Sequence, residues 1–430
     1  MIKAIGHFFR HTFVRQVITL LSGTSLSQII TLAALPFLTR FFAPEQFGQL
    51  ALFMSISRII ANISTGNIEK GIVLAENQEK AVHLFIFCLS SVLLISILSF
   101  VIILSGHQTW VSLAGFQNMP GIFYLLPVMI FTMGSNRVYQ QWFNRYQQYR
   151  GLSLSMITQS VVTAGVKLLS GVILCLQKTG LIIGSITGQI AGLSYLIIKN
   201  PHLFPKIRSL SSSIIRTELK LNQNFFWYLT PMSFLNTFSV DILIYALNII
   251  YSSTIVGWYH NAFKVINYPL DLLSRAFTTV FYRKMSETRQ QKKLYLLSYF
   301  INLFIATILL LPVLLWGPEI FSFVLGESWK PAGEIAVLLV PLSIASYSTR
   351  SISQVFSVKR KNQILLIWQS IYLLAAIMVI FIKKDNEMTD MLQIFVIVCS
   401  SLYFILAVIG YFEVSGILKI KPDTFKASGS

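Results

Sequence analysis

Residues 82–105 read VHLFIFCLSSVLLISILSFVIILS, and this stretch decides the class of the protein. The hydrocarbon core of a bilayer is about 30 Å thick and an α-helix rises about 1.5 Å per residue, so about 20 apolar residues are enough to cross it. The stretch contains no Lys, Arg, Asp or Glu. We therefore predict that 82–105 forms a transmembrane helix.

Apolar runs of similar length recur along the whole chain. Of its 430 residues, 54% are hydrophobic and 12% are charged, whereas a soluble chain carries about 25% charged residues. This composition excludes soluble enzymes, nucleic-acid-binding proteins and secreted disulfide scaffolds. Twelve spans are predicted, near residues 17–41, 46–65, 82–105, 118–136, 152–176, 179–198, 225–250, 255–281, 294–316, 333–357, 362–382 and 390–413.

The net charge of +18 is distributed in the way that orients membrane proteins. If the N-terminus is inside, the segments on that side hold 24 Lys and Arg residues and the outside segments hold five. One span more or fewer would invert every later loop, so this asymmetry supports twelve spans and predicts that both termini are cytoplasmic. Because the basic clusters are short and lie between apolar runs, no nucleic-acid partner is expected.

A shift of 209 residues aligns the chain with itself. The shift places Phe47-Gly48-Gln49-Leu50 over Val256-Gly257-Trp258-Tyr259, and it maps the first two spans onto the seventh and eighth. We predict an all-α membrane protein with two six-helix lobes related by a pseudo-two-fold axis along the membrane normal. The expected segments are a cytoplasmic amphipathic N-terminal segment at 1–15, lobes at 16–198 and 223–413, a cytoplasmic basic linker at 199–222 and a cytoplasmic tail at 414–430.

The sequence shows no catalytic or metal-binding signature. It contains neither a Walker-type Gly-rich loop nor a His-Glu-x-x-His motif, and its six histidines are scattered. The longest outside segments, near 106–117 and 317–332, are too short for an extracytoplasmic catalytic domain. We expect no enzymatic activity, no metal and no cofactor.

Ionisable side chains inside the predicted spans are the candidates for function, because a charge in the membrane is costly unless it faces a wet cavity or a partner. The candidate anions are Asp241 and Asp271. The candidate cations are Arg58, Lys167, Lys264, Arg275 and Arg350. The alternative for the three arginines is that they extend from span ends to the membrane surface.

The eighth predicted span places three charged residues on one helical face. Lys264, Asp271 and Arg275 are spaced i, i+7 and i+11, and Asp271 and Arg275 can neutralise each other at i, i+4. Lys264 lies near mid-span, which favours a cavity role. Asp241 in the seventh span is interpreted either as the partner of a cation such as Lys264 or as a site for a proton or Na⁺.

Two polar or small-residue stripes complete the pattern. Gln28 lies on a polar stripe of the first span, where hydrogen bonding between helices is the alternative to substrate contact. The sixth span repeats glycine at every fourth position from Gly180 to Gly192. Such spacing predicts close helix packing.

Several segments resemble polysaccharide-biosynthesis flippases, the O-antigen or capsule repeat-unit translocases of the multidrug/oligosaccharidyl-lipid/polysaccharide exporter superfamily. The first is the opening, with LSGTSLSQ at 21–28, PFLTR at 36–40 and PEQFG at 44–48. The second is Glu69 with the following Ile-Val-Leu at 72–74, and the third is 269–286. The family often has Arg-Tyr before this glutamate, where this chain has Asn67-Ile68.

The resemblance implies a multi-pass protein of the cell inner (cytoplasmic) membrane that moves an undecaprenyl-pyrophosphate-linked oligosaccharide from the inner to the outer leaflet. Alternating access would then expose a cationic cavity between the lobes. The residues expected to bind the pyrophosphate and sugar are Lys264, Arg275, Arg58, Lys167, Arg350 and Gln28. Asp241 and Asp271 would bind the coupling ion.

The expected partners are the lipid-linked oligosaccharide, membrane lipids, H⁺ or Na⁺, and polysaccharide polymerase machinery. One alternative is an H⁺- or Na⁺-coupled drug exporter of the same superfamily, which an acidic cavity would favour. Another is a membrane glycosyl polymerase or ligase, which would require a large extracytoplasmic loop.

Overall fold

A computed structural model describes residues 2–106, 120–173, 176, 179–200, 211–287, 290–359 and 361–416. In these ranges it describes the side chains from Ser22 onward except those of residues 120, 276, 279, 280, 283 and 287. All regular elements in these ranges are helical. Most of the predicted outside segment at 106–117, residues 201–210 of the predicted linker and residues 417–430 of the predicted tail lie outside the described residues. The predicted N-terminal segment is continuous with the first span in one helix.

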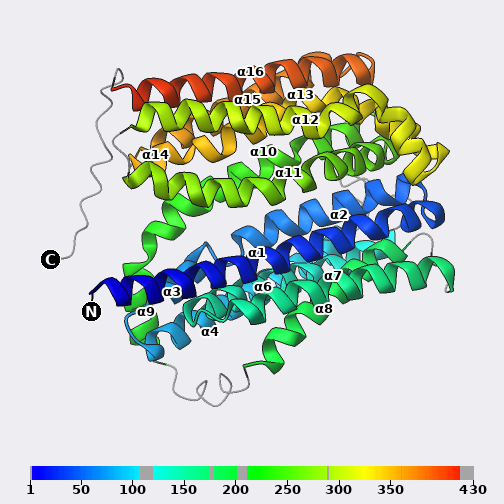
Figure 1. Cartoon of the computed structure of the whole chain (residues 1–430). Helices are drawn as coiled ribbons and strands as arrows, with labels where there is room; N and C mark the ends of the chain where they lie inside the picture. Colours follow the sequence, from blue (N-terminus) through cyan, green and yellow to red (C-terminus); the bar gives the residue numbers. More distant parts are fainter. Residues whose placement is uncertain are drawn as a thin grey trace. The chain divides into compact units, whose positions relative to one another are not determined.

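Within the described ranges, each predicted span overlaps a long helix (Figure 1). The fourth is displaced: the span was predicted at 118–136, whereas α6 covers Leu126–Arg145. They are α1 (Ile2–Phe41), α2 (Pro44–Ile63), α4 (Gln78–Ser105), α6 (Leu126–Arg145), α7 (Tyr149–Val172), α8 (Gly180–Ile198), α10 (Thr230–Ile250), α11 (Ser253–Glu287), α12 (Gln291–Leu325), α13 (Lys330–Ile352), α15 (Asn362–Lys383) and α16 (Met388–Val414). Short helices connect them: η1 (Ile68–Lys70), α3 (Gly71–Leu74), η2 (Pro120–Leu125), α9 (Ser212–Leu221), η4 (Phe225–Leu229), η5 (Glu327–Trp329) and α14 (Gln354–Val358).

Eight of these helices are long and apolar enough to cross a membrane by themselves in the described residues, and α2 with the bent segment after it makes a ninth. Helices α6 and α11 carry more polar residues than these. Helix α11, for example, holds Lys264, Asp271 and Arg275. Polar spans of this kind are stable in a membrane when their polar face is turned toward other helices or a cavity.

The helices pack into two units, Met1–Gly257 and Trp258–Ser430. In the first unit, α7 packs along both α1 and α8, while α2 contacts α6 and α10. The predicted close approach along the glycine stripe of α8 is confirmed: a Cβ at Gly184 would overlap Lys167, and one at Gly188 would overlap Thr163. Helix α10 groups with the first unit because it contacts α2. The division therefore falls at Gly257, whereas the sequence places the lobe boundary in the linker at 199–222. That lobe boundary stays a prediction.

Helix α2 also crosses the beginning of α11 within the first unit. A Cβ at Gly48 would overlap the carbonyl oxygen of Ser253, and a Cβ at Gly257 would overlap the carbonyl oxygen of Pro44. The 209-residue shift pairs Gly48 with Gly257 and Pro44 with Ser253. Each glycine thus lies against the backbone of the residue that precedes its counterpart by four positions. Only glycine allows the two backbones to approach this closely.

In the second unit, α13 packs against α12 and α16, and α15 packs against α16. Its core is a cluster that includes Phe281, Tyr295 and Phe356. At one end of this unit the buried Lys361 ammonium donates to the Glu413 carboxylate with an N–O distance of 2.6 Å. The pair joins the start of α15 to the end of α16.

A polar pocket in the first unit

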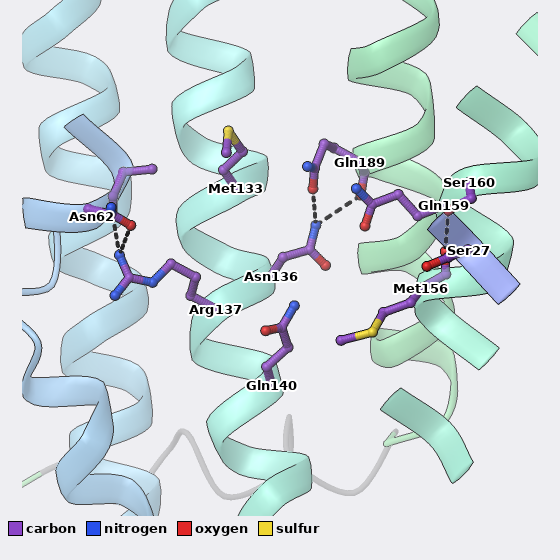
Figure 2. Close-up of a pocket in the computed structure, with 11 residues that line it drawn as sticks. Ser27, Asn62, Met133, Asn136, Arg137, Gln140, Met156, Gln159, Ser160 and Gln189 are labelled. Atoms are coloured by element: carbon purple, nitrogen blue, oxygen red, sulfur yellow. Dashed lines mark hydrogen bonds between the residues drawn. The ribbon is translucent and has the colours of Figure 1, made fainter. Parts of the chain in front are cut away.

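A pocket of about 290 Å³ opens between five helices of the first unit. Its walls come from α1, α2, α6, α7 and α8, and Figure 2 shows the side chains that meet there. They are Ser27, Ala61, Asn62, Met133, Asn136, Arg137, Gln140, Met156, Gln159, Ser160 and Gln189. The pocket is therefore lined mainly by neutral polar groups, although the helices that form it belong to the predicted membrane spans.

Helical spacing explains how the chain builds these walls. On α6, Met133, Asn136, Arg137 and Gln140 are spaced i, i+3, i+4 and i+7, which places them on one face. On α7, residues 156, 159 and 160 repeat the spacing. The glycine stripe of α8 brings α7 and α8 close together, because Gly192 leaves room for the Gln159 side chain. The small residues of α8 thus position the polar residues of α7.

Some carboxamides in the pocket are held by hydrogen bonds to other helices, and others make no hydrogen bond within the described residues. The Asn136 amide donates to the backbone oxygen of Gln189 at 3.1 Å and to its side-chain oxygen at 2.8 Å, which joins α6 to α8 (Figure 2). The side chains of Gln140 and Gln159, by contrast, make no hydrogen bond within the described residues. Both carboxamides line the pocket and retain a donor and an acceptor for a ligand.

Arg137 is the one ionisable residue among the pocket-lining residues described here. Its Nη1 donates to Asn62 Oδ1 at 2.5 Å, and its Nη2 donates to Glu69 Oε1 at 2.8 Å. Glu69 is 1% exposed, and its other carboxylate oxygen accepts from Thr65. The guanidinium is thus paired with a buried carboxylate, so the pocket has little net charge.

The loop after α2 turns sharply to bring Glu69 to this position. Gly66 and Asn67 have positive φ angles of 59° and 56°. Asparagine tolerates this left-handed region better than most residues, and the Asn67 amide also donates to Thr230 at 3.3 Å. The Asn67-Ile68 departure from the family pattern thus coincides with a left-handed turn.

A second polar contact joins α2 to α10. Arg58 donates through Nη2 to both carboxylate oxygens of Asp241, at 2.6 and 2.7 Å, and through Nε to Oδ2 at 3.2 Å. Nearby, Ser55 donates to the Tyr245 hydroxyl at 2.7 Å. The sequence identified both charged residues as candidates, and the structure brings them together.

The other predicted site residues are dispersed. In the first unit, Lys167 on α7 is half-buried beneath Gly184, and Gln28 on α1 is half-buried with an enclosed side-chain oxygen. Neither lines the pocket. On α11 in the second unit, Lys264 is half-buried and Arg275 is exposed.

Asp271 on α11 receives a hydrogen bond from Arg350 on α13. The i, i+4 spacing on α11 indicated Arg275 as a partner that can neutralise Asp271. The contact with Arg350 links residues 79 positions apart, so no local spacing rule points to it.

Sequence reasoning also missed most of the pocket. Asn136, Gln140 and Gln159 were not singled out, and Arg137 was counted among the inside basic residues. The signal that identifies them is the polar i, i+3, i+4, i+7 spacing on α6, which lies at the end of a span whose apolar character is weak.

Residues 37–334 match the family described as polysaccharide biosynthesis protein. The chain belongs to this family. None of the curated proteins compared with this sequence matched it.

Solved structures show the fold. The chain is similar to an outward-facing multidrug resistance MATE family transporter of the MOP superfamily, with a TM-score of 0.62, 15% identity and 94% of each chain covered. An inward-facing structure of such a transporter gives a TM-score of 0.60 and 14% identity, covering 93% of this chain and 94% of the other. A MOP superfamily transporter from Pyrococcus furiosus, described as having a binding pocket of reverse polarity, gives a TM-score of 0.59 and 13% identity, covering 94% of this chain and 96% of the other.

The family and the fold confirm the resemblance noted in the sequence. The protein is a multi-pass, all-helical membrane protein with the twelve-helix, two-lobed fold of these transporters.

Proposed function

We propose that this protein is a flippase that moves an undecaprenyl-pyrophosphate-linked oligosaccharide from the inner to the outer leaflet of the cytoplasmic membrane, with both termini in the cytoplasm. The observation that carries the proposal is the neutral polar pocket enclosed by predicted spans in a chain of the polysaccharide biosynthesis protein family. A hydrophilic head group cannot cross about 30 Å of hydrocarbon without replacing its bound water. Polar groups between the spans supply that replacement.

The lipid tail does not need to enter the protein, because it can stay in the bilayer while the head group passes. Solved structures with this fold include outward-facing and inward-facing transporters. An exchange between two such states would let the head group enter from one leaflet and leave toward the other by alternating access.

The charged part of the substrate requires a different environment from the sugars. A pyrophosphate is stabilised by cations, and we assign this role to Lys264, with Arg275, Arg58, Lys167 and Arg350 as further candidates and Gln28 as a polar contact. Two of the arginines, Arg58 and Arg350, are partly exposed while bound to Asp241 and Asp271. These two carboxylates are our candidates for the coupling H⁺ or Na⁺, and polysaccharide polymerase machinery is the proposed consumer of the product.

The pocket chemistry favours this function over the drug-exporter alternative. A cationic drug is best accommodated by carboxylates or aromatic faces, and the lining residues of this pocket include neither. The Glu69 carboxylate, which lies beside the pocket, is already bound to Arg137.

The direct test is complementation of a flippase-deficient strain, with surface polysaccharide as the readout and membrane protein levels checked. The wild-type chain should restore the polysaccharide. Lys264→Ala should abolish the activity, whereas Lys264→Arg should retain part of it, because the proposed contact needs positive charge rather than a particular geometry. If the wild-type chain and purified protein in vesicles both fail to move the lipid-linked oligosaccharide, the proposed function is wrong.

The coupling role has its own test. Asp241→Asn should remove the dependence of translocation on an ion gradient while the protein remains inserted. Unchanged gradient-driven transport would reduce Asp241 to the structural partner of Arg58.

A further inference from the structure

We infer that the pocket between α1, α2, α6, α7 and α8 binds an uncharged sugar ring of the substrate and does not receive its pyrophosphate. This inference rests on the proposed function, and it assigns the two parts of one head group to separate places in the protein.

The charge of the pocket does not suit a phosphate. A phosphate site needs positive charge that its ligand can reach, usually with several donors directed at one point. The guanidinium of Arg137 is committed to the buried Glu69 carboxylate at 2.8 Å and to the Asn62 side chain at 2.5 Å. A pyrophosphate in this pocket would have to compete with Glu69 and would lie near that negative charge.

The polar groups of the pocket include carboxamides, which suit a sugar. A sugar hydroxyl both donates and accepts a hydrogen bond, and so does a carboxamide. Gln140 and Gln159 face the pocket without a hydrogen-bond partner among the described residues. Ser27 and Ser160, in contrast, direct their hydroxyl hydrogens to the backbone of their own helices. The two glutamines therefore have the capacity that a ligand with several hydroxyl or acetamido groups would use.

Hydrogen bonds between helices already organise the pocket. The hydrogen bonds from Asn136 to Gln189 and from Arg137 to Asn62 hold α6 against α8 and α2. Fixing these side chains beforehand lowers the entropy that binding must overcome. The thioether side chains of Met133 and Met156 add apolar surface for the C–H face of a sugar ring.

The size of the pocket agrees with this ligand. Small-molecule sites occupy about 300–1,000 Å³, and this pocket of about 290 Å³ is at the lower end. A monosaccharide-sized group suits that volume better than a whole oligosaccharide.

The test compares two probes on the purified full chain in nanodiscs. One probe is undecaprenyl pyrophosphate carrying a single N-acetylhexosamine, and the other is undecaprenyl pyrophosphate without a sugar. The variant Gln140→Met/Gln159→Met removes both carboxamides and nearly keeps their volume. The control is Gln393→Met, which changes an exposed glutamine on α16.

The double variant should bind the sugar-bearing probe about tenfold more weakly, since two hydrogen bonds are lost. Its affinity for the bare probe should not change, and the control should match the wild type with both probes. Equal weakening for both probes, or no weakening for either, would overturn the inference. A wild-type chain that does not distinguish the probes would also overturn it and would leave the flippase proposal intact. Binding of neither probe would contradict the proposed function itself.

A charge variant provides a second measurement, independent of any loss of packing. Gln159→Lys places a cation in the pocket. If the pocket binds the sugar ring, this variant should bind the sugar-bearing probe more weakly than the wild type does, and its affinity for the bare probe should not change. Tighter binding of the bare probe would show that the pyrophosphate enters the pocket and would contradict the inference.

Discussion

Arg58 of α2 binds both carboxylate oxygens of Asp241 of α10, across 183 residues of sequence. The two ends of the pair differ in environment: the Asp241 side chain is 1% exposed and that of Arg58 is 43% exposed. The carboxylate therefore depends on this contact for its charge compensation, whereas the guanidinium retains access to solvent or ligand. The pair both joins two helices and presents a cation.

The first prediction follows from this asymmetry. Arg58→Ala should lower the free energy of unfolding by about 3 kcal/mol, because removing one partner of a buried pair strands the other charge. Chemical unfolding in detergent, followed by tryptophan fluorescence, measures the change. Adding Asp241→Asn should recover part of the loss, and Arg150→Ala at the exposed start of α7 serves as the control. If Arg58→Ala and its control unfold alike, the pair does not stabilise the fold.

Glu69 gives the second prediction. Glu69→Gln should reduce stability by about 3 kcal/mol, since Arg137 would lose its buried counter-charge. Glu76→Gln, seven residues further along the chain, is the matched control. The exposed Glu76 interacts with Lys80, whose hydrogen bond lowers the pKa of the Glu76 carboxyl, and surface pairs of this kind contribute little. Equal effects of the two substitutions, measured by thermal unfolding, would argue against a structural role for Glu69.

The crossing of α2 with α11 gives the third prediction. Gly48→Ala and Gly257→Ala should each cost about 3 kcal/mol or prevent insertion, because the new methyl group would meet backbone atoms, which cannot rotate away. Gly165→Ala is the control, since a Cβ at Gly165 on α7 meets nothing within 4 Å. Replacing glycine by alanine in a helix should leave stability unchanged or raise it by up to about 1 kcal/mol. Membrane fractionation and thermal unfolding provide the readouts, and normal insertion and stability of Gly48→Ala would contradict the close crossing.

The fourth prediction concerns Lys361 and Glu413 in the second unit. Lys361→Ala should destabilise the protein by about 3 kcal/mol, because it leaves the buried Glu413 carboxylate without its cation. Replacing both residues by apolar side chains, as in Lys361→Met/Glu413→Leu, should restore most of this loss. Lys359→Ala, which changes a half-buried lysine two positions earlier, should have little effect. A double variant less stable than Lys361→Ala would contradict this prediction. It would show that the ion pair stabilises the fold more than two buried apolar side chains do.

Hydropathy predicted most spans well because the bilayer as solvent requires long apolar helices. It placed the fourth span too early, since the end of α6 is polar. The orientation inferred from charge asymmetry stays a prediction. The glycine stripe of α8 was also predictable, since close packing depends on residue size along a single helix. The long-range ion pairs were not. Asp271 contacts Arg350 on another helix, and this contact depends on tertiary packing that no spacing rule contains.

The polar pocket shows the same limit. The face formed by Asn136, Arg137 and Gln140 is readable from α6 alone. Its neutrality, however, arises only when the left-handed turn at Asn67 brings Glu69 to Arg137. A sequence can indicate a cation on a helix, but the charge that a ligand meets depends on the folded neighbours.

The two methionines of the pocket, Met133 and Met156, have a consequence for substrate range. An unbranched thioether has several accessible rotamers and adapts its shape at low cost, whereas the hydrogen-bonded Asn136 and Arg137 cannot move without breaking their contacts. The pocket thus combines adaptable positions on α6 and α7 with rigid ones on α6. If the pocket binds a sugar ring as we propose, rings that differ in the substituents next to Met133 and Met156 can be accommodated without a change of the backbone.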